Sequence, residues 1–262
     1  MDGPSLDIDR WQGMVRAEAP DLKQAVVLLV LSYLMPAFSV LKRVAAARDD
    51  VSISAIKADG LAAVAPVLAK DLAPALDTNW STGELSLSAV LSVRFPGRCR
   101  LDLMVADSTK SLTVAWSNGR RRTEGPELPA AAVALEQLCA TLALKSGTDG
   151  ESRGALEHHL ASNKIDSRQV SLARFEGQVA YVLGDRRPGA SSFWVYKERF
   201  LPARVELADA TGHWDVRFID YTSQATGEWL PRVVEVYREG ELHLRMTLLS
   251  ADGRASLEGV KF

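Results

Sequence analysis

Glu157, His158 and His159 are the residues of this chain best suited by type to bind a metal ion or to transfer protons. Adjacent side chains on a helix point about 100° apart, whereas zinc-binding helices place two histidines four residues apart, with a third ligand elsewhere. We therefore expect surface histidines here and no metal site. Asp215 and Asp220 are expected on opposite faces of one strand, which does not suit paired acid–base catalysis.

No enzyme motif accompanies these residues. The sequence contains no G-x-S-x-G nucleophile elbow, no G-x-x-x-x-G-K-[ST] phosphate loop and no G-x-G-x-x-G dinucleotide fingerprint. We therefore expect a protein that is not an enzyme and that needs no cofactor.

The two cysteines, Cys99 and Cys139, bear on redox state and compartment. One lies in a predicted strand and the other in a predicted helix. In an oxidising compartment they could close a disulfide. Alternatively, each is an independent buried thiol, because free cysteine behaves as a small apolar side chain. The sequence favours neither reading.

Charge argues against nucleic acid as a partner. The formal net charge is −2 and the isoelectric point is about 6.1, whereas nucleic-acid binders usually carry a basic stripe. The one basic cluster, Arg120–Arg122, follows Asn118–Gly119 and precedes Pro126, so we expect a solvated loop there.

The first 36 residues form a separate segment. Ala25–Met35 is an almost continuous apolar run that ends at Pro36, with Lys23 just before it. It is shorter than the roughly 20 residues of a membrane-spanning helix but fits the apolar core of a signal peptide. Residues 1–36 are therefore expected to be an export leader or an N-terminal anchor, the alternative being a buried N-terminal helix.

Alternation of apolar and polar residues dominates the rest of the chain and predicts strands with one buried face. Gly83–Phe95 shows it most clearly. Helical spacing replaces it in the centre, and further helices are expected at the start of this region. The predicted helices are Ala37–Arg48, an interrupted Leu61–Leu76, Pro129–Leu144 and Glu151–Asn163, with a short strand at Val51–Lys57.

Strands, then helices, then strands, without βαβ alternation, indicate an α+β fold. We expect a strongly curved antiparallel sheet, an incomplete β-barrel, with a few helices packed in or over its concave apolar face. Large side chains on such a face either line a pocket or fill the core. The candidate cavity-wall residues are Leu87, Leu91, Val93, Trp116, Phe193, Val216 and Phe218.

Four segments resemble the LolA/LolB-type lipoprotein-carrier superfamily. They are Gly83–Leu87, Phe95–Leu103 (FPGRCRLDL), Phe200–Val205 and Val216–Val236, the last with D-Y followed by G-x-W-L-P-R. The resemblance covers residues 37–262 and implies one lipid-binding domain there, an incomplete barrel wrapped around helices. In one respect the chain departs from the family. Phe95 stands directly before the turn proline, where the family carries an arginine that helps to open the cavity.

The resemblance implies a periplasmic, non-enzymatic carrier that binds the acyl chains of lipoproteins or other lipids and passes them toward the outer membrane. Its partners would be those acyl chains, an inner-membrane donor protein and an outer-membrane acceptor protein. The alternative is a periplasmic sensor or interaction module on the same scaffold, which would form a stable protein complex rather than transfer lipid. A hydrolase on this scaffold would need a nucleophile and a base in the cavity, and the sequence offers neither.

Overall fold

The computed structural model describes residues 34–262 except 50, 52, 107, 109, 118, 145–148, 188, 210, 211 and 228. The expected leader, residues 1–36, therefore lies almost wholly outside the described residues and stays a prediction. Pro36–Phe262 forms one compact unit. Its helices are α2 (Ala37–Asp49), α3 (Pro66–Ala75), α4 (Pro129–Leu142) and α5 (Asp149–Ser162). Among the described residues, no helix is long and apolar enough to cross a membrane.

Twelve strands form a single sheet in which every paired neighbour is antiparallel. They are β1 (Ala55–Val64), β2 (Leu85–Arg94), β3 (Arg98–Met104), β4 (Ser111–Ser117), β5 (Arg120–Glu124), β6 (Val170–Phe175), β7 (Gln178–Gly184), β8 (Ser192–Tyr196), β9 (Pro202–Asp209), β10 (Gly212–Ile219), β11 (Val233–Arg238) and β12 (Glu241–Asp252).

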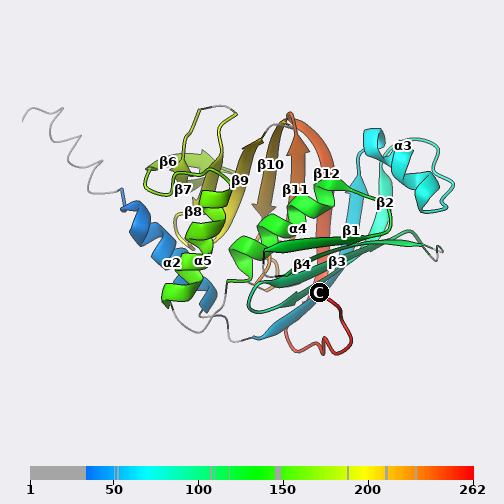
Figure 1. The fold of residues 1–262 in the computed structure, drawn as a ribbon, viewed down its shortest axis with the longest axis horizontal. Coiled ribbons are helices and arrows are strands. Elements are labelled where there is room, and N and C mark those ends of the chain that lie inside the picture. The colour runs from blue at the N-terminus through cyan, green and yellow to red at the C-terminus, as the bar shows by residue number, and fades with distance from the viewer. Residues whose placement is uncertain are drawn as a thin grey trace, which may run out of the picture. The chain divides into compact units, whose positions relative to one another are not determined.

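The sheet is open. Its order is β5-β4-β3-β2-β1-β12-β11-β10-β9-β8-β7-β6, with β5 and β6 as the two edge strands. Helices α4 and α5 follow β5 and precede β6 in the chain, and α4 runs across the sheet (Figure 1). Helix α2 packs along α5, and α3 lies at the other end of the sheet. The expected α+β fold, a curved antiparallel sheet that does not close and carries helices on its concave side, is confirmed.

One face of the sheet is apolar from strand to strand. The backbone register links Leu87 to Ala62, Ala62 to Met246, Met246 to Val234 and Val234 to Phe218. All five side chains are buried. Because side chains alternate between the two faces of a strand, these residues share the face that α4 covers.

Two expectations about secondary structure were wrong. Residues 61–64 belong to β1 rather than to an interrupted helix, and that strand begins at Ala55 instead of Val51. Arg120–Arg122 lies in β5, an edge strand, and not in a loop. Backbone pairing with β4 holds β5 in place although its arginine side chains are exposed. Charged side chains are common on edge strands because they discourage pairing with other chains.

Candidate functional site

Helix α4 fills the concave side of the sheet. It contacts strands from both halves of the sheet, namely β3, β4, β5, β9, β10, β11 and β12. Pro129 begins the helix, where a missing N–H costs nothing. Ala130, Ala131 and Ala134 are buried against the sheet, and their small side chains let the helix approach closely. The apolar face that the sequence predicts is thus covered by a helix that is itself largely apolar.

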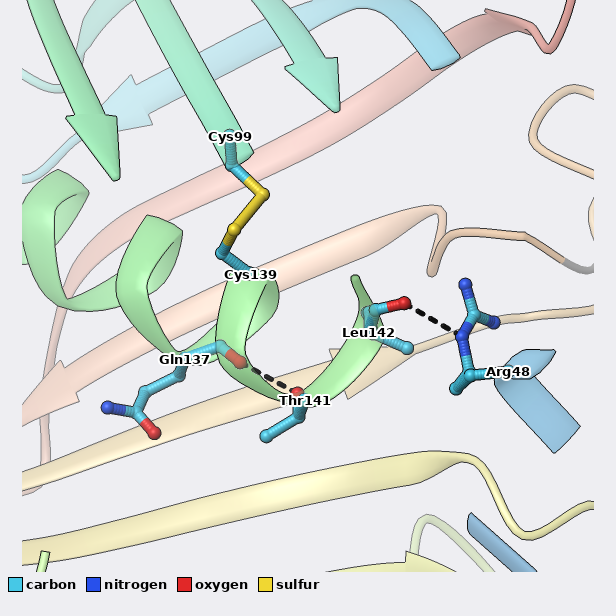
Figure 2. Close-up of a disulfide and its surroundings, with 6 residues drawn as sticks. All are labelled: Arg48, Cys99, Gln137, Cys139, Thr141 and Leu142. Carbon is cyan, nitrogen blue, oxygen red and sulfur yellow. Dashed lines mark hydrogen bonds between the residues drawn. A yellow bond between two sulfur atoms is a disulfide. The ribbon is translucent and has the colours of Figure 1, made fainter. Parts of the chain in front are cut away.

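A disulfide between Cys99 of β3 and Cys139 of α4 holds the helix to the sheet (Figure 2). The two Cα atoms lie 5.8 Å apart. This decides between the two readings of the cysteines. A disulfide is typical of proteins that fold in an oxidising compartment.

Arg48 secures the carboxyl end of α4. Its side chain is fully buried, its Nε donates to the carbonyl oxygen of Leu142 at 2.9 Å (Figure 2), and its Nη2 donates to that of Trp229 at 2.8 Å. The Gly97 N–H donates to the carbonyl oxygen of Ala143 at 2.7 Å. A cation here complements the negative end of the helix dipole. Burial lowers the pKa of Arg48 to about 10, so the guanidinium stays charged at neutral pH.

Six of the seven predicted wall residues are fully buried and face the side that α4 covers. Leu87, Leu91 and Val93 extend from β2, Phe193 from β8, and Val216 and Phe218 from β10. Trp116, on β4, is half-buried. It is the one member of the set that lines a described cleft. The structure therefore places the seven on one concave face, and their role as an acyl-chain wall stays a prediction.

That cleft has a volume of about 490 Å³, within the roughly 300–1,000 Å³ range of small-molecule sites. It opens between the carboxyl half of α4, helix α5 and the turns that join β2 to β3 and β4 to β5. Most of its lining is apolar. The lining residues are Pro96, Gly97, Trp116, Gly119, Glu136, Cys139, Ala140, Ala143, Leu144, Ala155, His158, His159 and Ser162.

The polar groups of the cleft lie on the two helices. His159 is 9% exposed, and its Nε2 lies 2.8 Å from Oε1 of Gln137. Burial, and to a lesser extent the neighbouring His158, lowers the pKa of His159 to about 4, so the ring is neutral at physiological pH. Burial also raises the pKa of Glu136, while Arg121 opposes that shift. The expectation of a surface histidine at position 159 was wrong, because Gln137 of α4 packs against it.

The hydrogen-bond partners of the His159 ring are side-chain amides. Nε2 of His159 lies 2.8 Å from Oε1 of Gln137 and 3.3 Å from Nδ2 of Asn163, and neither is a hydroxyl or a thiol that it could activate. Within the described part of the chain, no three metal-ligating side chains come together. Sequence reasoning missed Arg48, Glu136 and Gln137. Each is a polar residue on a predicted helix, and a single polar residue there carries no signal of its own.

No family model matches the sequence, and no curated protein matches it. Among solved structures, the chain is similar to the LolA superfamily protein NE2245 from Nitrosomonas europaea, with a TM-score of 0.48, 10% identity, and coverage of 85% of this chain and 96% of that one. It is also similar to a DUF1329 family protein from Desulfovibrio piger (TM-score 0.42, 9% identity, 84% and 93% covered). MucB gives a TM-score of 0.31 at 15% identity, and the match covers 84% of this chain and 59% of that one. These are similarities of architecture at low sequence identity.

Proposed function

We propose that this chain is a periplasmic, non-enzymatic carrier that binds acyl chains of lipoproteins or other lipids and passes them toward the outer membrane. The observation that carries the proposal is the continuous apolar face of an open sheet, covered by one alanine-rich helix beside an apolar cleft. An acyl chain needs such a surface, because each CH₂ removed from water contributes about 0.8 kcal/mol.

The disulfide and the predicted leader support the periplasmic assignment. The bond between Cys99 and Cys139 suits an oxidising compartment, and Ala25–Met35 has the composition of a signal-peptide core. Uniformly tight binding gives no transfer, so release requires an acceptor that binds the lipid better or a change of conformation. An inner-membrane donor protein and an outer-membrane acceptor protein would meet these needs.

We infer that acyl chains enter beside Trp116 and extend along the face that carries Leu87, Leu91 and Val93. On β8 and β10, Phe193, Val216 and Phe218 would continue the same wall. The polar groups of the cleft lie at its helical side and would meet the polar end of the lipid.

Native mass spectrometry of protein recovered from the envelope of its host, followed by uptake of a fluorescent fatty acid, tests the proposal. A co-purifying lipid and saturable uptake are expected. Ala140→Trp places a large side chain in the cleft and should abolish uptake. Ala161→Trp makes the same change at an exposed position of α5 and should leave uptake unchanged. A ligand-free mass without uptake would contradict the carrier and favour the sensor or interaction module.

A further inference from the structure

A row of arginines lies on the outer face of the sheet, directly behind the mouth of the cleft. Cys99 faces α4, so its neighbours on β3, Arg98 and Arg100, point to the opposite, outer face. The register places Arg94 of β2, Arg98 and Arg120 of β5 in one cross-strand row, with Ser117 of β4 between the last two. Figure 1 shows β3 and β4 beside α4, one of the two cleft helices.

A second row lies beside the first. It carries Arg100 of β3 and Arg122 of β5 with Ala115 of β4 between them. We call the five outward arginines of the two rows, Arg94, Arg98, Arg100, Arg120 and Arg122, the arginine rim.

Acidic side chains compensate only part of the arginine rim. Arg100 pairs with Asp102 at 2.7 Å, and Arg122 pairs with Glu124 at 2.6 Å. In the first row, Arg98 and Arg120 are exposed, and no acidic group among the described residues pairs with either.

Arg94, the third arginine of the first row, also has no carboxylate partner among the described residues. Arg94 donates from Nη2 to the carbonyl oxygen of Leu257 at 2.8 Å, and its guanidinium lies 5.3 Å from the ring centroid of Phe262. Like charges opposite one another across strands destabilise a sheet. The first row of the rim is therefore a concentration of positive charge on a chain whose net charge is −2.

The arginine rim and the cleft share the same two turns. Pro96 and Gly97 of the β2–β3 turn and Gly119 of the β4–β5 turn line the apolar cleft on the inner side. On the outer side, a recess of about 590 Å³ is lined by Ala115, Ser117, Arg120–Arg122 and Phe262. An apolar mouth edged by cations matches the surface of an anionic bilayer, which is apolar in depth and negatively charged at the headgroups.

We propose that the arginine rim docks this protein on the surface of an anionic phospholipid membrane, with the β2–β3 and β4–β5 turns that edge the cleft at the lipid surface. The inference rests on the proposed function only for the reason why the protein would dock. Docking itself needs no bound acyl chain. Each basic residue near an anionic surface strengthens partitioning about fivefold, and added salt screens the attraction.

Vesicle flotation tests the docking. The full-length protein is mixed with phosphatidylcholine vesicles that either contain or lack phosphatidylglycerol. We expect binding to the anionic vesicles alone, and we expect rising sodium chloride to abolish it. Arg98→Glu with Arg120→Glu should weaken binding by at least about 25-fold. Arg174→Glu with Arg186→Glu changes the net charge equally at exposed positions beside the opposite edge of the sheet and should leave binding within about twofold.

Several results would overturn the proposal. They are no binding of the wild-type protein to anionic vesicles, equal binding to neutral vesicles, and equal losses in the two double variants. Displacement by inorganic phosphate beyond that by chloride at the same ionic strength would indicate a discrete anion site instead of membrane docking. Circular dichroism checks folding, and Arg98→Gln with Arg120→Gln serves if charge reversal disturbs it. Fatty-acid uptake without vesicles is measured separately, so failure of the carrier function is distinguishable from failure of docking.

Discussion

Breaking the bond between Cys99 and Cys139 tests how firmly α4 is held to the sheet. The two residues are separated by 40 positions in the sequence. A cross-link over a loop of that length removes chain entropy from the unfolded state that corresponds to about 4 kcal/mol at 25 °C. For a domain of this size, 1 kcal/mol shifts the melting temperature by roughly 2–4 °C. Loss of the bond should therefore lower the melting temperature by about 8–16 °C.

Urea unfolding of three samples separates the cross-link from the packing of the sulfur atoms. They are the oxidised protein, the same protein reduced with dithiothreitol, and Cys99→Ala with Cys139→Ala. The reduced protein keeps both buried sulfur atoms, so its lower unfolding midpoint reports the cross-link alone. The double variant should lose slightly more, because it also leaves two small voids.

An unchanged midpoint in protein whose free thiols are verified by mass would refute the reasoning. It would mean that the unfolded chain gains no freedom when the loop is opened. A midpoint that falls only in the alanine variant would assign the stabilisation to packing of the sulfur atoms.

Three other changes probe the helices and the centre of the sheet. Arg48→Ala leaves two main-chain carbonyls without their donor and should lower the free energy of unfolding by about 3 kcal/mol in urea, with Arg48→Lys recovering only part. His159 has a pKa of about 4 in the folded protein against 6.5 in the unfolded chain, so the unfolded state takes up the proton first. The stability present above pH 6.5 should therefore fall by about 3 kcal/mol as the pH drops to 4, and urea unfolding of His159→Gln should lack this component. Gly60→Ala brings a Cβ against the backbone of β12 and should lower the free energy of unfolding by more than about 1 kcal/mol. Gly154→Ala, in open space on α5, should raise it by about 0.5–1 kcal/mol in the same assay, the size of a helix-propensity effect.

The strands that could be predicted are those in which apolar side chains point inward and polar ones outward. β2 follows that rule, with Leu85, Leu87 and Leu91 buried. β1 departs from it at one step, because Gly60 is buried while Leu61 is exposed. The close approach of β12 leaves no room for a side chain at position 60. This constraint belongs to the partner strand and cannot be read from the sequence of β1.

The candidate cleft could be predicted only in part, for a related reason. Trp116 was identified because it is a large apolar residue on an alternating strand. The partner that buries His159 is Gln137, 22 residues earlier on another helix. Arg48 finds its partners 94 and 181 residues away. Such pairs depend on how the helices are placed over the sheet, which local patterns do not specify.

The strand order also determines the order in which contacts become available during folding. Strands β1 to β5 pair with their neighbours in the chain, and so do β6 to β12. Only the β1–β12 pair joins distant segments, Ala55–Val64 and Glu241–Asp252. Loop-closure entropy opposes such non-local pairing until other contacts compensate for it. Two meanders that form early and a seam at β1 and β12 that closes late are the folding route that this topology favours.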